Sequence, residues 1–130
     1  MNSKAKIGEN EKNLAKNWFE KLRDIICDEF EKIELNQVSG PYPPSDPGKF
    51  ERKNTTRQGK NNQDGGGGVM SVMRNGRVFE KVGVNISTVY GDLEPLAQKS
   101  LSSRHDIPGL KDDPRFWASG ISLVAHMQSP

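Results

Sequence analysis

The chain has 130 residues, which is enough for one domain of ordinary size. Only 32% of the residues are apolar, beside 13 glycines and 8 prolines, so we expect a small core that is completed by something outside this chain. The formal net charge of +2 is too balanced to indicate nucleic-acid or membrane binding, and the single cysteine, Cys27, excludes a disulfide framework and a metal site made of several cysteines.

The N-terminal third predicts one amphipathic helix over residues 11–36, because apolar residues recur there at three- and four-residue steps. The apolar stripe consists of Leu14, Trp18, Leu22, Ile25, Ile26, Phe30 and Ile33. Mixed charge on the polar side argues against a membrane role, so we expect the stripe to pack on a sheet. Cys27 lies among these residues and is predicted to be a small buried hydrophobe. No window has a signal core or the length of a membrane span, and we expect a cytoplasmic protein.

Residues 37–64 predict a polar, mobile loop, which begins where a run of prolines ends the helix. Its second half is basic and carries Lys49, Arg52, Lys53, Arg57 and Lys60. The alternative interpretation is a basic arm that binds a polyanion. Phe50 is the only aromatic residue there that could stack on a base, so we expect no nucleic-acid partner.

Residues 65–91 predict a β-hairpin at the centre of an antiparallel sheet, because an Asn-Gly step at 75–76 joins two apolar, β-branched runs. In the second run the even positions from Val78 to Tyr90 are mostly apolar, which indicates one buried and one polar face. The four glycines from Gly65 to Gly68 do not match a phosphate-binding loop, because a strand and not a helix follows them. They suit either a tight entry into a strand or a ligand that lies against the main chain.

The C-terminal third predicts a short helix over residues 92–102 and a strand over residues 116–126. Period two places Ser122 and His126 on one face of that strand. At roughly 3.3 Å per residue they lie about 13 Å apart, which excludes a direct serine–histidine hydrogen bond. No second metal ligand has a suitable spacing to His126.

Two blocks of the sequence resemble the oxygen-dependent coproporphyrinogen III oxidases. In the first block the glycine quartet precedes a strand, a turn and the run Val-Phe-Glu-Lys-Val-Gly-Val-Asn-Ile-Ser-Thr-Val-Tyr-Gly, residues 78–91. The second block is Ala-Ser-Gly-Ile-Ser-Leu-Val-Ala-His, residues 118–126. The order of the blocks is that of the family. The sequence departs from the family pattern after His126, where Met127 replaces a proline, and in the polar insert of residues 49–64.

The resemblance implies an α+β fold, with an antiparallel β-sheet flanked by helices. Residues 1–130 are expected to be the incomplete, N-terminal part of a single domain of this kind. The implied reaction is oxidative decarboxylation of coproporphyrinogen III to protoporphyrinogen IX in haem biosynthesis, by a cytoplasmic homodimer. Molecular oxygen is the co-substrate and no organic cofactor is expected; a divalent metal, often manganese, has been proposed for bacterial members. The alternative is an inactive dimerising fragment of that enzyme, held together by an exposed sheet edge.

Residue by residue, Ser122 matches the family's substrate-contacting serine, and His126 matches a histidine proposed as a metal ligand. The dimer contact is expected along Val78, Phe79, Glu80, Lys81, Val82, Gly83, Val84, Asn85, Ile86 and Ser87. The family's proton-donor histidine, its Asn-x-Arg pattern and its catalytic aspartate and arginines are expected beyond Pro130. No catalytic residue is therefore expected within these 130 residues, and the isolated chain is expected to be inactive.

Overall fold

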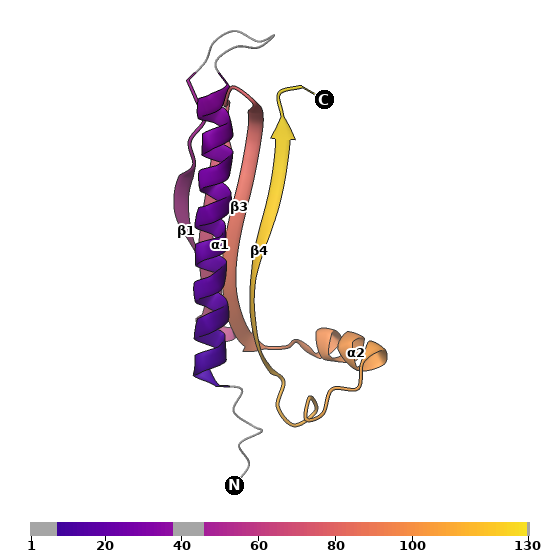
Figure 1. Ribbon diagram of the computed structural model, residues 1–130. Helices are drawn as coiled ribbons and strands as arrows, with labels where there is room; N and C mark the ends of the chain where they lie inside the picture. The colour runs from indigo at the N-terminus through magenta and orange to yellow at the C-terminus, as the bar shows by residue number, and fades with distance from the viewer. Residues whose placement is uncertain (1–7, 38–45, 130) are drawn as a thin grey trace.

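A long helix lies along one face of an antiparallel sheet in the computed structural model, which describes residues 8–37 and 46–129 (Figure 1). In chain order the elements are α1 (Glu9–Asn36), β1 (Glu51–Gln58), the short 3-10 turn η2 (Lys60–Asn62), β2 (Asp64–Arg74), β3 (Phe79–Asp92), α2 (Pro95–Arg104) and β4 (Arg115–Met127). The predicted α+β class with an antiparallel sheet is confirmed, and the sheet is open. In the described ranges no helix has the length and apolar character that crossing a membrane requires.

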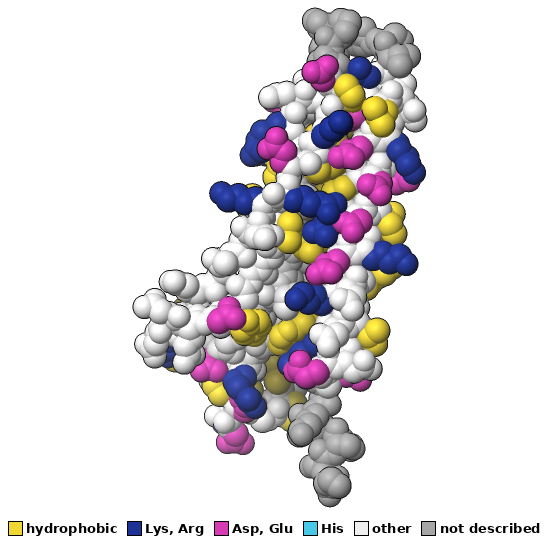
Figure 2. All heavy atoms as spheres, turned by 90° about the vertical axis from the view of Figure 1, so that its left-hand side faces the viewer, with side chains coloured by type: hydrophobic (Ala, Val, Ile, Leu, Met, Phe, Trp, Pro, Cys, Tyr) yellow, Lys and Arg dark blue, Asp and Glu magenta, His cyan; other side chains and the backbone are white. Residues whose placement is uncertain are grey.

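The sheet is a meander in which the spatial order β1-β2-β3-β4 follows the chain order and every pair is antiparallel. α1 runs the length of the strands, whereas α2 projects sideways from the connection between β3 and β4 (Figure 1). Figure 2 shows acidic and basic side chains mixed along the molecule. β1 and β4 are the edges of the sheet, and β2 and β3 form its centre.

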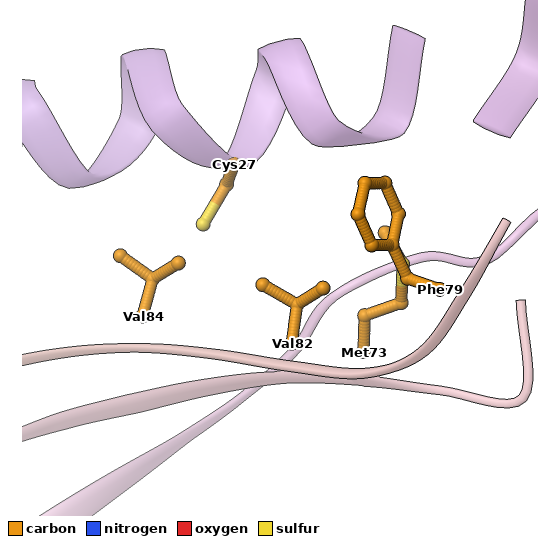
Figure 3. Close-up of a cluster of buried hydrophobic side chains, with 5 residues drawn as sticks. All are labelled: Cys27, Met73, Phe79, Val82 and Val84. Carbon is orange, nitrogen blue, oxygen red and sulfur yellow. The ribbon is translucent and has the colours of Figure 1, made fainter. Parts of the chain in front are cut away.

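The core lies between α1 and the two central strands. It consists of Cys27, Met73, Phe79, Val82 and Val84, whose side chains meet between helix and sheet (Figure 3). Phe30 of α1 meets Phe79 edge to face with ring centroids 4.8 Å apart. Cys27 is only 2% exposed, which confirms the predicted buried hydrophobe, and burial raises the pKa of its thiol. A core of this size is small for 130 residues, in keeping with the low apolar content.

The prediction of a loop over residues 37–64 is wrong for its second half, because β1 occupies Glu51–Gln58. Residues 38–45 of that predicted loop lie outside the described part of the chain. β1 pairs with β2 from Glu51↔Val72 to Gln58↔Asp64. Nearly all its side chains are exposed, so it shows no apolar alternation, and its place in the sheet depends on main-chain hydrogen bonds.

The hairpin is present, but its turn is wider than the Asn-Gly step predicts. Asn75, at φ 56°, donates its N–H to the carbonyl of Glu80 (2.9 Å), and Gly76 donates to the carbonyl of Phe79 (2.9 Å). The register of β3 on β4 then shifts between Phe79 and Lys81. This bulge at Glu80 brings Phe79 into the same buried layer as Val82, although strict alternation from Val82 would turn it outward.

α1 is rotated about its axis relative to the prediction. Much of the apolar stripe does not pack on the sheet, and four members remain exposed: Leu14 (62%), Trp18 (51%), Ile25 (46%) and Ile33 (46%). The helix instead buries Arg23, Cys27 and Glu34. Polar contacts to β1 and to the residue before it set this rotation, because Asp24 pairs with Arg52 (2.9 Å) and Glu31 accepts the N–H of Phe50 (2.9 Å).

Glu34, in the last turn of α1, is fully buried and joins three separate segments. Its Oε1 accepts the backbone N–H of Gly48 (3.0 Å) and of Arg77 (2.5 Å), and its Oε2 accepts that of Val78 (2.6 Å). A Cβ on Gly76 would lie 1.9 Å from Oε1, so any other residue there would displace the carboxylate. The carboxylate therefore fixes the helix end, the approach to β1 and the β2–β3 turn together.

We expect Glu34→Ala to lower the free energy of unfolding by roughly 2–4 kcal/mol, because three buried N–H groups lose their acceptor. Glu34→Gln should lower the free energy of unfolding by less. The amide oxygen of the glutamine still accepts two of the three backbone N–H groups, while its NH₂ group faces the N–H of Val78. Urea unfolding followed by circular dichroism measures both. Glu29→Ala is the matched control on the same helix, because Glu29 makes an exposed pair with Lys32, and the loss of this pair should change stability by under about 0.5 kcal/mol. A Glu34→Ala variant as stable as this control would contradict the anchoring role.

The glycines at the start of β2 are required by neighbouring main chains. A Cβ on Gly67 would lie 2.1 Å from the carbonyl oxygen of Thr55 in β1, and one on Gly68 would lie 1.9 Å from that of Ile86 in β3. Gly66 has φ +91°, which strains any other residue. Of the two interpretations of the quartet, close packing of the sheet's own strands accounts for these positions.

We expect Gly68→Ala to destabilise the chain by about 2 kcal/mol or more, since strands β2 and β3 must separate to admit the methyl group. Gly120→Ala in β4 is the control, because a Cβ there meets nothing within 4 Å. Thermal unfolding of the two variants compares them directly. Equal melting temperatures would show that the close approach at Gly68 is not needed.

Candidate functional site

The sheet has one covered and one open face. Residues opposite each other on neighbouring strands point to the same side of a sheet. The row Arg52–Ser71–Val84 faces α1, because Arg52 binds Asp24 of the helix. The alternate residues form the other side, which we call the open face; α1 does not cover it and α2 projects away (Figure 1). Its successive rows are Arg74–Lys81–His126, Glu51–Val72–Gly83–Val124, Lys53–Met70–Asn85–Ser122 and Thr55–Gly68–Ser87–Gly120.

Ser122 and His126 both lie on the open face of β4 and both are exposed. Because β4 is extended from Arg115 to Met127, the two residues are about 13 Å apart and make no nucleophile–base pair. Ser122 lies opposite Asn85, and His126 lies opposite Lys81. The structure thus brings each residue of the second sequence block beside one from the first.

The row of His126 is positively charged. Arg74 and Lys81 share it, and both are exposed. Arg77, the other arginine of the turn, is directed elsewhere, because its Nη1 donates to the carbonyl of Gln37 (3.2 Å) and its N–H to Glu34. Arg74 is therefore the arginine that shares a face with Ser122.

The described residues do not fit a metal centre at His126. No group of three or more histidine, cysteine, aspartate or glutamate side chains that could hold a metal ion occurs within residues 8–37 and 46–129. The two cationic neighbours in its row also oppose a bound cation. The metal-binding role of His126 stays a prediction that requires ligands from outside this region.

The segment predicted to make a dimer contact, residues 78–87, begins one residue before β3 and continues through more than half of that strand. This strand is paired on both sides, with β2 and with β4, so its main chain has no unpaired edge. Phe79, Val82 and Val84 are buried in the core. The outward-facing members are Lys81, Gly83, Asn85 and Ser87 on the open face, and the dimer contact itself stays a prediction.

Sequence reasoning missed a second polar cluster at the other end of the sheet. The hydroxyl of Tyr90 donates to Oδ2 of Asp64 (2.5 Å), while Oδ1 accepts the N–H of Gly66 (3.0 Å). The hydrogen bond from Tyr90 lowers the pKa of Asp64, and the same bond raises the pKa of Tyr90. The predicted apolar role of Tyr90 concealed this pair, and no sequence signal linked the two residues.

The same pair lines a cavity of about 390 Å³ between α1 and the glycine-rich end of β2. Lys16 and Glu20 of α1 contribute to its other wall. Ser122 and His126 do not line this cavity, since they point to the opposite side of the sheet. We therefore base the functional argument on the open face, where residues of both sequence blocks meet.

Comparison with known proteins agrees with the motifs. A family described as "Coproporphyrinogen III oxidase" matches residues 14–130. Proteins named oxygen-dependent coproporphyrinogen-III oxidase are similar to this chain: that of Rickettsia felis is 50% identical over 121 residues, which is 92% of this chain and 38% of the relative. The Rickettsia bellii protein is 50% identical over 123 residues, 93% of this chain and 39% of the relative. The chain thus spans about two fifths of the length of these relatives. Because the family match covers nearly all of the described residues, this chain belongs to the coproporphyrinogen III oxidase family.

Proposed function

We propose that this chain forms the N-terminal part of an oxygen-dependent coproporphyrinogen III oxidase, and that its open face contributes to the binding of coproporphyrinogen III. The observation that supports this proposal most directly is the register of β3 on β4. It places Ser122 and His126 from one family block beside Asn85 and Lys81 from the other, on the side of the sheet that α1 leaves uncovered.

The charge of the open face suits this substrate. Coproporphyrinogen III carries four carboxylates, and Arg74 and Lys81 present cationic groups in one row with His126. The Ser122 row lies about 13 Å further along the strands, at roughly 3.3 Å per residue. A ligand of macrocycle size can therefore contact both rows at once, with its carboxylates at the basic row.

In the proposed reaction each of two propionate side chains loses carbon dioxide and becomes a vinyl group. The hydrogen of one C–H bond passes with its electron pair to molecular oxygen, which takes up one further proton and leaves as hydrogen peroxide. The electron pair of the broken bond to carbon dioxide forms the double bond of the vinyl group. The role of this chain is to bind and orient the substrate. We place the residues that move the proton outside these 130 residues, together with any metal ligands that would accompany His126.

We also infer that the complete protein is a cytoplasmic homodimer. The β4 edge supports an association role, because beside its unpaired main chain Leu123 (48%) and Met127 (57%) are exposed. The same edge supports the alternative that the isolated chain is an inactive, dimerising fragment. A polyanion-binding module has less support, because Arg52 is paired with Asp24, and Arg57 donates to the carbonyl of Tyr90 (3.1 Å).

We expect a full-length oxidase carrying residues 14–130 of this sequence to convert coproporphyrinogen III in the presence of oxygen, and the isolated chain to show no conversion. In the full-length protein Ser122→Ala should lower kcat/KM about tenfold or more, through loss of a substrate hydrogen bond. Ser102→Ala in the projecting α2 is the control, with unchanged rates. Fluorescence of the oxidised porphyrin product measures conversion. A Ser122→Ala variant with the wild-type rate would remove Ser122 from the site.

We expect Arg74→Gln to raise KM about fivefold or more with little change in kcat, because it removes a charge that binds a carboxylate. The effect should shrink as salt screens the interaction. Arg104→Gln, at the exposed end of α2, is the charge-matched control. If both variants raise KM equally, a general electrostatic effect and not a local contact is responsible.

A further inference from the structure

Asn85 lies at the centre of the open face and has an unusual amide. Its Oδ1 is buried but accepts no hydrogen bond from any residue that the structure describes. Buried polar atoms normally have a hydrogen-bond partner. An atom without one has given up its hydrogen bonds to water and gained none in the protein, which costs free energy. The Nδ2 group lies on the open side, 3.8 Å from the position that a Cβ on Gly83 would occupy. The side chain thus keeps its acceptor turned inward and its donor turned toward the open face.

The positions around Asn85 leave space above the main chain. Gly83 lies two residues before Asn85 on β3, and Gly120 lies two residues before Ser122 on β4. Both glycines are on the open face. A Cβ on Gly120 would meet nothing within 4 Å, and one on Gly83 would meet only the amide of Asn85. Neither glycine has a φ in the left-handed region. In contrast to Gly67 and Gly68, the packing of the described residues therefore does not require glycine at these two positions.

We propose that Asn85 is a substrate-positioning residue, whose amide oxygen accepts a hydrogen bond from a pyrrole N–H of the porphyrinogen held beside Ser122. This inference rests on the proposed function and extends it by one residue. A half-turn about χ2 exchanges the amide oxygen and nitrogen and brings the acceptor to the open face. Gly83 and Gly120 then allow the macrocycle to approach the strands closely.

The chemistry of the ligand fits an acceptor here. All four ring nitrogens of a porphyrinogen carry hydrogen, so the ring centre presents donors only and is best matched by acceptors. The carboxylates at the periphery need cations instead, which the row of Arg74 and Lys81 provides. The open face thus places an acceptor beside Ser122 at its centre, with Arg74 and Lys81 further along the strands and Lys53 two strands away on β1.

The test compares Asn85→Ala, Asn85→Asp and wild type in a full-length oxidase carrying this sequence. We expect Asn85→Ala to raise KM for coproporphyrinogen III about tenfold while changing kcat less than about threefold. Asn85→Asp, which keeps an acceptor, should stay within about threefold of wild-type KM. The melting temperature of the unliganded Asn85→Ala protein should equal or exceed that of wild type, because the amide oxygen has no partner to lose. Added coproporphyrinogen, under exclusion of oxygen, should raise the melting temperature of wild type and Asn85→Asp more than that of Asn85→Ala.

Asn54→Ala is the matched control, since Asn54 is an exposed asparagine on the opposite side of the sheet, in register with Val69. An unchanged KM in Asn85→Ala overturns the proposal, and so does a lowered melting temperature of its unliganded form, which would assign Asn85 a structural partner. An equal rise of KM in Asn85→Asp and Asn85→Ala would also overturn the proposal. Wild-type protein that neither converts nor is stabilised by coproporphyrinogen refutes the proposed function itself, and is thereby distinguished from failure of the Asn85 assignment.

Discussion

The buried carboxylate of Glu34 is the constraint on which the arrangement depends. It accepts three backbone N–H groups, from Gly48, Arg77 and Val78, which lie far apart in the sequence. A carboxylate without water is stable only where donors surround it, so the three segments must come together around the helix end. That meeting places the β2–β3 turn, which sets where β3 begins and therefore which of its residues face the helix. The position of the open face follows from this one anchor.

The sequence predicted those features that have a local pattern. The helix, the hairpin and β4 followed from periodicity, and Ser122 and His126 followed from a family motif. β1 was missed because an edge strand with nearly all side chains exposed has no apolar alternation to detect. The burial of Phe79 was not predicted, because one bulged residue, Glu80, changes the phase of the strand. The pairing of Ser122 with Asn85 required a register between distant strands, which no local signal contains.

Glycines serve two distinct purposes in this sheet. At Gly67 and Gly68 carbonyl oxygens of the flanking strands occupy the space that a side chain would need. At Gly120 the space is empty, and at Gly83 only the amide of Asn85 lies within 4 Å, so the absence of side chains leaves main chain uncovered on the open face. A sequence reader sees the same residue in both cases. The two cases are distinguished by the distance from a Cβ built on each glycine to its neighbours. A short distance shows that the fold requires glycine, and a long one shows that it does not.

The rotation of α1 has a consequence for how the helix tolerates substitution. Its inner side is specified by directional contacts of Asp24, Glu31 and Glu34, and its outer side carries exposed apolar residues such as Trp18. The inner side should therefore be sensitive to a change of polarity even where size is preserved. The outer side contributes little to holding the helix in place, so its side chains can vary to match whatever surface they meet. The inner side of this helix thus combines the apolar contacts of Cys27 and Phe30 with charged groups in fixed directions, whereas the large apolar residues Leu14, Trp18 and Ile25 are exposed.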